Sequence, residues 1–444
     1  MSRFIIEGGI PLRGVHNTPG NKNAALPMLA ATLLTSEPVT LTNVPLIRDV
    51  RCMLELLKTI GATVELDEEK RIVTIQAATI ATTCLPHELC RQIRTSFLFV
   101  GPLLARCGNV MLYPPGGDVI GQRRLDPHVC GFRAMGAEFH EGPPYSLAVS
   151  PRLHGAGQHL LSEASVTGTE NLVMAAVLAD GESNFYNTAC EPHVQNLCEM
   201  LVQMGADISG IGTNRIVVHG VHSLHGGTFR IWGDYIEAAS YLVAAAVTHG
   251  SLDIGPVEGR EFEVLRRPLE RFGLSFSIED HRVRYQYDPA HPLRIETDLS
   301  NAIPKIDDGI WPALPSDLLS VLIVLATQSD GLVTFFEKMF ESRLYFVDHL
   351  IGMGAQIVHC DPHRVVVRGP SKLRSSVVSS PDIRAGFAMI IAALCAEGRT
   401  IINNAESIDR GYEALEVHLA ALGANITRET DKDKTPLENS EILH

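Results

Sequence analysis

Six times along this chain, a helix-like segment ends on a bulky apolar residue, a glycine and usually an alanine, and a short strand-like run follows. Successive glycines lie about 70 to 80 residues apart, beyond the roughly 20 to 50 residues of solenoid repeats, so each unit can contain several helices and strands. The sequence therefore predicts a sixfold internal repeat of small α/β units. The six triplets are Ile60-Gly61-Ala62, Met135-Gly136-Ala137, Met204-Gly205-Ala206, Phe272-Gly273-Leu274, Met353-Gly354-Ala355 and Leu422-Gly423-Ala424.

Each unit also contains a second helix that is apolar on nearly every face. Such a helix must be buried on all sides. Three of them in each half of the chain would form a shared core, with strands and amphipathic helices around it. The expected fold is α/β, with two inside-out barrels built from six βαβαββ-like units, buried helices within and sheets outside. The apolar segments begin at Ala24, Ser96, Leu172, Tyr241, Leu318 and Ala385.

The length of the chain favours two domains, because 444 residues exceed what one hydrophobic core usually organises. A doubly wound nucleotide-binding sheet is the alternative fold. It would need a glycine-rich turn after the first strand and an acidic residue about 20 positions later. No G-x-G-x-x-G occurs at such a place.

Charge and composition exclude several classes of function. A formal net charge of -14 argues against a general nucleic-acid binder, which needs a basic surface. The N-terminus does not resemble an export signal, and no apolar run approaches the roughly 20 residues that span a bilayer, so we expect a cytoplasmic protein without a membrane segment. The nine cysteines form no C-x-x-C pair and the histidines show no ligand spacing, so we expect reduced thiols and no metal site.

Polar residues immediately precede the apolar helices, and several of them are cationic. Aspartates at helix starts are ordinary N-caps. Lys22, Arg94 and Arg384 are different, because a cation at a helix start opposes the helix dipole unless an anion lies between them. Arg343 and Arg410 head the second helices of the last two units. On spacing alone, these cations either converge on a phosphorylated substrate or are scattered surface arginines.

Several motifs in one order resemble the enolpyruvyl transferases, and within that family the members that act on UDP-N-acetylglucosamine. They cover residues 1 to about 427 and lack the lysine-serine start and the G-N-x-G-T segment typical of the sister enzyme of aromatic biosynthesis. The motifs are GNKNAALPMLAATLL from Gly20, VTLTNVPLIRDVR from Val39, GPLLAR from Gly101, PPGGDVIGQRRLDPH from Pro114, GTENLVMAAVLA from Gly168, SGIGTNRIVVHGV from Ser209, LPSDL from Leu314, and DIRAG and IDRGYE near the end.

The resemblance implies two barrels that face a cleft. The first domain would span residues 22–230 and carry a lid loop, 114–124; the second would combine 1–21 with 231–427, and 428–444 would form a disordered tail. The implied reaction transfers the enolpyruvyl group of phosphoenolpyruvate to the 3-hydroxyl of UDP-N-acetylglucosamine and releases phosphate, without a cofactor. The implied partners are these small molecules only, with no nucleic acid and no membrane, and we expect a monomer.

The resemblance also implies the site residues. Asp118, Asp317, Lys22 and Arg123 would be catalytic, with Asp317 as the base beside the acceptor hydroxyl. The phosphoenolpyruvate ligands would be Lys22, Arg94, Arg123, Arg343, Arg384 and Arg410, with Asp382 nearby. The acceptor ligands would be Asn23, Arg94, Arg124, Asp126, His128, Ser165, Val166, Thr167 and Asp317.

Four positions depart from the family's usual pattern. Asp118 stands where many members have the lid cysteine, although some naturally carry aspartate. Arg124 replaces a proline, Glu163 a frequent lysine, and Thr167 a glycine. An acid beside a diphosphate could lower affinity by about 1 kcal/mol. Two alternatives therefore stay open, namely transfer to a different nucleotide or sugar acceptor, and a catalytically silent paralogue.

Overall fold

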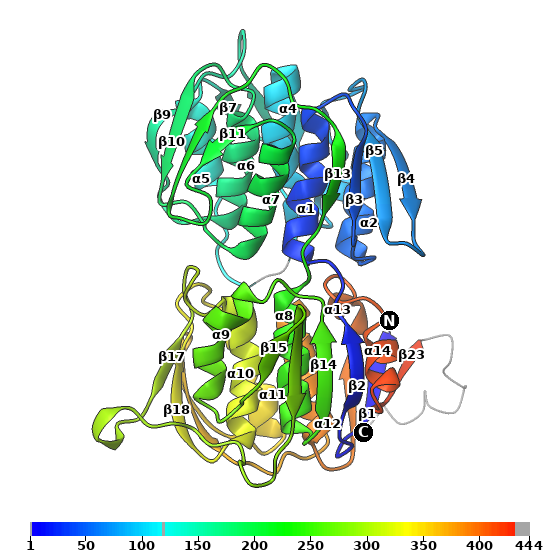
Figure 1. Ribbon diagram of the computed structural model, residues 1–444, viewed down its shortest axis with the longest axis vertical. Coiled ribbons are helices and arrows are strands. Elements are labelled where there is room, and N and C mark those ends of the chain that lie inside the picture. The colour runs from blue at the N-terminus through cyan, green and yellow to red at the C-terminus, as the bar shows by residue number, and fades with distance from the viewer. Residues whose placement is uncertain (1, 118–119, 431–444) are drawn as a thin grey trace.

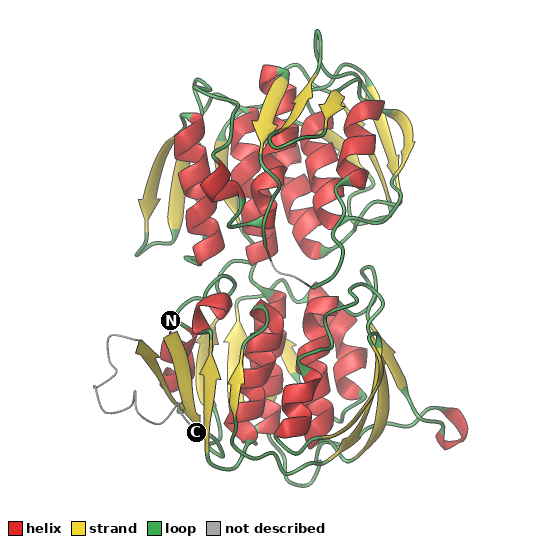
Figure 2. Ribbon diagram, turned by 180° about the vertical axis from the view of Figure 1, so that it is seen from behind, coloured by secondary structure: helices red, strands yellow, loops and turns green. Residues whose placement is uncertain are grey.

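The computed structural model describes residues 2–117 and 120–430, which form two lobes lying end to end (Figure 1). Helices fill the middle of each lobe and strands lie on its outside (Figure 2). This arrangement confirms the predicted inside-out α/β barrels. Within the described ranges, none of the helices combines the length and the apolar character that crossing a membrane requires.

The buried hydrophobic residues form two separate clusters, one in each lobe. The first cluster runs from Ala24 to Ile231. The second runs from Tyr235 to Ile426 and also takes in Phe4, Ile6 and Leu12 from the start of the chain. We therefore propose a division of the molecule near residues 21 and 231.

The third unit shows the repeat in its complete form. Its order is β9 (Gly157–Leu160), α6 (Val166–Ala176), β10 (Glu182–Tyr186), α7 (Pro192–Gln203), β11 (Asp207–Ser209) and β12 (Arg215–His219). The sheet order is β11-β12-β10-β9, with β9 parallel to β10 and the other pairs antiparallel. The parallel pair is joined through α6, which is buried on all sides at the centre of the lobe.

The first and fourth units exchange their first strands between the two domains. Strand β2 (Arg13–Asn17) precedes the first unit in sequence but pairs with β14 (Ser251–Gly255) of the second domain. Strand β13 (Gly227–Arg230) precedes the fourth unit but pairs with β3 (Val39–Thr42) of the first domain. The chain consequently crosses twice between the lobes, and both crossings end at the start of a buried helix.

The remaining elements follow the same plan. The first unit adds α1 (Lys22–Ala31), η1 (Thr32–Leu34), α2 (Arg48–Ile60), β4 (Thr63–Asp67) and β5 (Ile72–Gln76). The second has α3 (His87–Cys90), η2 (Arg94–Phe99), α4 (Val100–Cys107), β6 (Asn109–Leu112), α5 (Asp126–Ala134), β7 (Glu138–His140) and β8 (Tyr145–Ala148). The fourth adds α8 (Tyr235–Val247), α9 (Arg260–Glu270), β15 (Ser277–Glu279) and β16 (Arg282–Gln286).

The last two units complete the second domain. The fifth has η3 (Leu299–Asn301), β17 (Lys305–Asp307), α10 (Ser316–Gln328), β18 (Gly331–Phe336), α11 (Val347–Gly352), β19 (Gln356–Asp361) and β20 (Arg364–Gly369). The sixth has β21 (Val377–Ser379), α12 (Ile383–Cys395), β22 (Arg399–Asn403), α13 (Ala405–Ile408), α14 (Leu415–Ala421) and β23 (Asn425–Thr430). Its sheet is completed by β1 (Ser2–Glu7), which lies between β22 and β23.

The six repeated glycines all adopt the left-handed conformation, with φ between 74° and 107°. Glycine has no Cβ and takes this conformation without strain. In five units the alanine after the glycine donates its N–H to the carbonyl five residues earlier, at 2.9 to 3.0 Å. The repeated triplet is therefore a helix stop that turns the chain into the next strand.

Two sequence expectations are corrected by the structure. The tail was expected to begin at Arg428, but Arg428 to Thr430 lie in β23, and Arg428 forms ion pairs with Asp409 and Glu416; residues 431–444 lie outside the described residues. The apolar segments also predicted helix starts that lie too late in the sequence. Lys22, Asp317 and Arg384 lie within the first helical turns rather than before them.

Candidate active site

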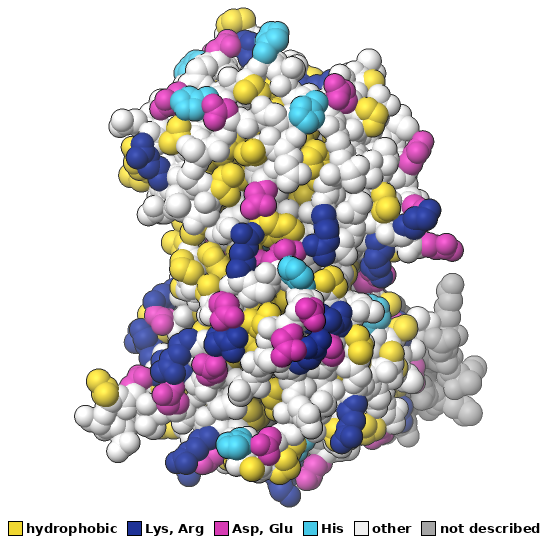
Figure 3. Space-filling view, viewed as in Figure 1, with side chains coloured by type: hydrophobic (Ala, Val, Ile, Leu, Met, Phe, Trp, Pro, Cys, Tyr) yellow, Lys and Arg dark blue, Asp and Glu magenta, His cyan; other side chains and the backbone are white. Residues whose placement is uncertain are grey.

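A cavity of about 600 Å³ opens between the two domains and is lined by residues of both. Figure 3 shows Lys and Arg side chains on both sides of the waist between the lobes. Of the fifteen residues predicted for the site, twelve lie along this cavity: Lys22, Asn23, Arg94, Arg123, Arg124, Ser165, Val166, Thr167, Asp317, Arg343, Arg384 and Arg410. Asp118 lies outside the described residues, and Asp126 and His128 are discussed below.

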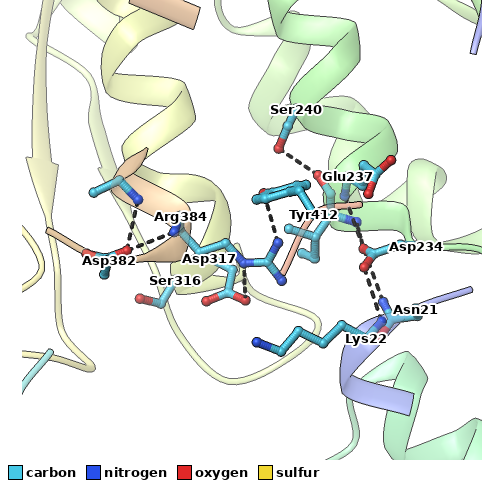
Figure 4. Close-up of polar contacts among 12 residues, drawn as sticks. Asn21, Lys22, Asp234, Glu237, Ser240, Ser316, Asp317, Asp382, Arg384 and Tyr412 are labelled. Atoms are coloured by element: carbon cyan, nitrogen blue, oxygen red, sulfur yellow. Dashed lines mark hydrogen bonds and ion pairs between the residues drawn. The ribbon is translucent and has the colours of Figure 1, made fainter. Parts of the chain in front are cut away.

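Lys22 is fixed by helix caps at the two crossings. Asn21 is the N-cap of α1 and accepts a hydrogen bond from the Ala24 N–H at 3.0 Å. Asp234, the N-cap of α8 in the other domain, accepts from the Lys22 N–H and from the Asn21 amide, both at 3.3 Å (Figure 4). The first turn of α1 is thereby bound to the start of α8, and the Lys22 side chain is directed into the cleft.

Asp49 connects Lys22 to a cation of the second domain. It lies in the first turn of α2, only 4% exposed, and its carboxylate is 2.9 Å from Lys22 Nζ and 3.2 Å from Arg410 Nε. A buried carboxylate is stable when it is paired in this way. The sequence analysis did not include Asp49, because an acid in a first helical turn is ordinary and nothing local indicates that Arg410 lies beside it.

Asp317 lies between two arginines of the second domain. Its carboxylate is 3.0 Å from Arg343 Nη2. It is also 3.0 Å from Arg384 Nε (Figure 4). Burial acts to raise the pKa of Asp317, but the charges of Arg384 and Arg343 outweigh it and hold the pKa well below the usual range. Asp317 is therefore ionised. Arg384 also donates to the Tyr412 hydroxyl at 2.8 Å, which fixes the guanidinium.

The carboxylate of Asp382 caps a helix. It is the N-cap of α12 and accepts from the N–H groups of Arg384 and Ala385 at 2.8 and 2.9 Å. Arg384 thus begins a buried helix with its side chain turned toward Asp317, which supplies the anion that a cation at this position needs.

The described part of the lid loop is closed onto both domains. The Arg94 guanidinium donates to the backbone carbonyls of Arg123 and Arg124. Burial, followed by the charge of Arg123, lowers the pKa of Arg94 to about 10. On the other side, the Ser342 N–H donates to the Ile120 carbonyl at 3.1 Å, so the loop contacts the second domain.

The residues predicted to hold the nucleotide separate into two groups. Ser165 is the N-cap of α6, and Thr167 lies in its first turn beside the cavity. His128 lies behind this turn, only 1% exposed, with Nε2 3.2 Å from Thr167 Oγ1. Burial, with a smaller contribution from Arg94, lowers the pKa of His128 to about 3, so the ring is neutral and positions Thr167. Asp126 is paired with Arg124 at 2.9 Å and does not line the cavity.

Other residues that line the cavity were not expected from the sequence. Gln122, Lys338 and Trp311 belong to loops, where one sequence gives little positional information. Glu170, Glu191 and His193 lie on or beside α6 and α7. The polar segment TEN at the start of an apolar helix was a usable signal for Glu170, whereas Glu191 resembled an ordinary acid preceding a helix.

Two solved structures have the same architecture as this chain. The enolpyruvyl transferase NikO from Streptomyces tendae superposes with a TM-score of 0.86 at 23% identity, covering 97% of this chain and 99% of that one. EPSP synthase from Acinetobacter baumannii gives 0.76 at 18%, covering 97% and 100%. At these identities the likeness establishes the fold, a two-domain inside-out α/β protein.

Sequence relatives establish the family. Residues 6–419 match the EPSP synthase (3-phosphoshikimate 1-carboxyvinyltransferase) family. The UDP-N-acetylglucosamine 1-carboxyvinyltransferase of Bradyrhizobium diazoefficiens is 49% identical over 426 residues, covering 96% of this chain and 98% of that protein. The Treponema denticola protein of the same name is 47% identical, covering 96% and 99%. The chain belongs to the enolpyruvyl transferase family.

Proposed function

We propose that this chain transfers the enolpyruvyl group of phosphoenolpyruvate to the 3-hydroxyl of UDP-N-acetylglucosamine and releases phosphate, the first committed step of peptidoglycan precursor synthesis. The observation that carries the proposal is the convergence of cations from both domains on one cavity around an ionised Asp317. Relatives at 49% and 47% identity bear the name of this activity.

Phosphoenolpyruvate carries a carboxylate and, on the neighbouring carbon, a phosphate ester. This chain offers cations on either side of the cleft. Lys22 and Arg410 converge from the two domains on Asp49. Arg343 and Arg384 converge on Asp317. An anion that enters between these pairs gains charge-assisted hydrogen bonds from both domains, so binding also holds the domains together. Bidentate guanidinium groups suit both phosphate and carboxylate.

Asp317 is our candidate for the base that removes the proton of the acceptor hydroxyl. The hydroxyl oxygen then bonds to the central carbon of phosphoenolpyruvate, while an acid delivers a proton to the methylene carbon. Loss of that proton and of phosphate from the tetrahedral adduct gives the enol ether product. Closure of the lid over the cleft excludes water from these charged intermediates.

We assign the acid role to Asp118, on its sequence position alone. A free aspartic acid with a pKa of about 3.9 is almost fully ionised at pH 7, whereas a thiol with a pKa of about 8.5 is protonated. Asp118 can act as an acid only where desolvation and the substrate's charges raise its pKa. We therefore expect activity to decline at lower pH on the alkaline side than in the Asp118→Cys variant. Superimposable pH profiles would contradict this assignment.

The presence of aspartate rather than cysteine at position 118 also predicts that the wild-type protein is insensitive to fosfomycin. A carboxylate is a far weaker nucleophile toward an epoxide than a thiolate. After incubation with the antibiotic, intact-mass spectrometry should show no adduct on the wild-type protein and one adduct on Asp118→Cys. A rapidly formed adduct at Asp118 itself would refute the prediction.

Transfer to another acceptor is the second candidate, and the observation that favours it lies on the nucleotide side of the cavity. Glu163 lines the cavity, where it would repel a diphosphate. Arg124 is paired with Asp126 rather than with Glu163, so its charge is already partly compensated. Release of phosphate with a different acceptor would support this candidate.

We propose a cytoplasmic enzyme that acts as a monomer, without a cofactor, on small-molecule substrates, in a pathway that maintains cell shape through the cell cycle. The first experiment is phosphate release from phosphoenolpyruvate with UDP-N-acetylglucosamine, free N-acetylglucosamine, UMP and shikimate 3-phosphate offered separately. Release with the first alone is the expected result. Phosphate release with none of the four acceptors would favour a catalytically silent paralogue. The presence of Lys22, Arg123, Asp317 and Arg410 argues against that alternative.

A further inference from the structure

Two histidines and one glutamate of the second domain lie together outside the cavity. They are His16 on β2, Glu237 in the first turn of α8, and His418 on α14. One ligand atom from each residue, a ring nitrogen or a carboxylate oxygen, lies within 4.8 Å of the other two. The sequence gave no sign of a metal site because these residues come from three distant segments of the chain.

Two of the three ligand atoms are already in contact. His16 Nε2 lies 2.9 Å from Glu237 Oε1, and the two residues are 3% and 4% exposed. The His16 ring also stacks on the Tyr241 ring, with centroids 3.7 Å apart and planes 15° from parallel. Strand pairing and this stacking hold the imidazole in place, so the first two ligands are preorganised.

His418 completes the cluster from the surface side. Its ring centroid is 5.7 Å from that of His16, with the planes tilted by 60°. The residue is half-buried, and its ring nitrogens form no hydrogen bond with a described residue. An ion reaches buried ligands only from solvent, and His418 is the member of the cluster that solvent touches most. A ring nitrogen of His418 is therefore available to an entering ion.

The buried carboxylate of Glu237 favours a cation at this place. Among the described residues, its one hydrogen-bond partner is the His16 ring. Buried carboxylates are normally paired with a cation or coordinate a metal. An ion between Glu237 and the two imidazoles supplies the missing positive charge and leaves both rings neutral, as metal ligands must be.

The donor set selects the kind of ion. Imidazole nitrogen with carboxylate oxygen suits Zn²⁺ and related first-row transition metals, whereas Mg²⁺ and Ca²⁺ prefer oxygen ligands. Ligand distances of about 2.0 to 2.2 Å place neighbouring ligand atoms of a tetrahedral ion about 3.3 to 3.6 Å apart. From the 4.8 Å limit of the cluster, a shift of about 1 Å in the half-exposed His418 side chain reaches this spacing.

We propose that His16, Glu237 and His418 bind one divalent transition-metal ion of the zinc type, and that this ion joins β2, α8 and α14. None of the three residues lines the cavity, so the role of the ion is structural. Strand β2 leads into the crossing that ends at Lys22, and α8 begins at Asp234, which accepts the Lys22 N–H. The ion therefore stabilises the base of this crossing. The inference is independent of the proposed function.

The test is Zn²⁺ binding by the full chain after removal of metal with a chelator. Equilibrium dialysis at pH 7.5, where an ordinary histidine is mostly neutral, should show one high-affinity Zn²⁺ per chain. The melting temperature should rise by about 5 °C at a Zn²⁺ concentration 100 times Kd. Mg²⁺ at the same concentrations should give neither effect.

His418→Gln is the main variant, because a half-exposed side chain can be replaced without disturbing the core. Its metal-free melting temperature should equal that of the wild type, and its Zn²⁺ affinity should fall by at least about 100-fold, the upper end of the loss seen when only an outer-shell partner of a metal is removed. Glu237→Gln, of nearly equal size, should also lose the thermal shift.

His291→Gln is the matched control. His291 Nδ1 lies 2.7 Å from the Asp288 carboxylate in an exposed imidazole–carboxylate pair of the same domain. This variant should bind Zn²⁺ as the wild type does. The site is overturned if the wild type binds no Zn²⁺ with high affinity. Equal affinities and thermal shifts in the wild type, His418→Gln and Glu237→Gln would overturn it as well, because the bound ion would then lie elsewhere.

Discussion

Asp317, which we propose as the base, forms ion pairs with two arginines in the structure. In the described structure its two oxygens are held by Arg343 and Arg384, and these charges lower its pKa. The carboxylate is therefore a weak base until an anionic substrate draws the guanidinium groups away. For the base role that we propose, this arrangement predicts a weakly basic Asp317 in the empty cleft and a more basic one once phosphoenolpyruvate binds.

Replacement of Asp317 by asparagine should lower kcat by about 10²- to 10⁴-fold, as expected for the loss of a general base. The stabilising effect of Asp317 is present above the ordinary aspartate pKa of about 3.9 and is lost as the pH falls through its lowered pKa in the folded protein. The stability difference between variant and wild type should therefore shrink in acid. Denaturant unfolding at pH 7 and at about pH 2.5, which lies within this window, and steady-state kinetics at pH 7 check both effects.

Asp253→Asn is the control for this prediction. Asp253 is also held by two arginines, Arg282 and Arg284, but on the outer sheet of the second domain and outside the cavity. It should lose stability without losing kcat. Full activity of Asp317→Asn would exclude Asp317 as the base.

The helix stops illustrate what the sequence could predict at the level of elements. Gly354 ends the segment after α11 with φ of +101°, whereas Gly352 lies within the helix and a Cβ there would meet no atom within 4 Å. Gly354→Ala should lower the free energy of unfolding by about 1 to 2 kcal/mol, because a left-handed conformation is unfavourable for alanine. Gly352→Ala should raise it by about 0.5 to 1 kcal/mol. Urea denaturation measures both, and equal effects would contradict the assignment of the repeat.

The loop after β18 is a second element whose behaviour follows from one side chain. Glu337 accepts hydrogen bonds from the N–H groups of Met339 and Phe340, both at 3.0 Å, and it interacts with Asp308. Burial, and then the hydrogen bond and charge of Asp308, raise the pKa of Glu337 to about 8. Because the folded protein holds this proton more tightly, the stabilising effect is full below the ordinary glutamate pKa of about 4.3 and is lost as the pH rises toward 8.

Glu337→Gln mimics the protonated form and should reduce the decline in stability between pH 5 and pH 8. The same loop carries Ser342, which contacts the lid, so the variant should also retain a low KM for both substrates at pH 8. Melting temperatures across this pH range test the first effect. A wild-type and a variant curve of the same slope would show that Glu337 does not hold the proton.

Regular elements and individual site residues differ in how far the sequence specifies them. The helix stops and the all-apolar helices are local patterns, so the repeat and the inside-out fold were predictable. The placement of β2 with the second domain and of β13 with the first followed only from the family resemblance, because each strand fits either sheet by its local pattern. Asp49 was missed for the same reason, since its partner Arg410 lies 361 residues away in sequence.

At the scale of the whole molecule, ion pairs between described residues connect the two domains beside the cleft. Arg71 of the first domain forms two hydrogen bonds with Glu413 of the second, at 2.6 and 3.0 Å, and Glu413 also accepts from the Leu46 N–H at 3.1 Å. Asp49 and Arg410 add the pair inside the cavity. The substrates and these pairs therefore stabilise the same closed arrangement.

Arg71→Ala should weaken the closed arrangement without altering the groups that contact the reacting atoms. We expect the KM values of both substrates to rise by about three- to tenfold with kcat nearly unchanged, because part of the binding energy is now used to close the domains. Small-angle scattering should show a larger radius of gyration for the unliganded variant and an unchanged value when both substrates are bound. Arg267→Ala is the matched control, since Arg267 pairs with Glu296 within the second domain and on the surface. A fall in kcat with unchanged KM values would mean that the Arg71 pair acts on the chemical step rather than on closure.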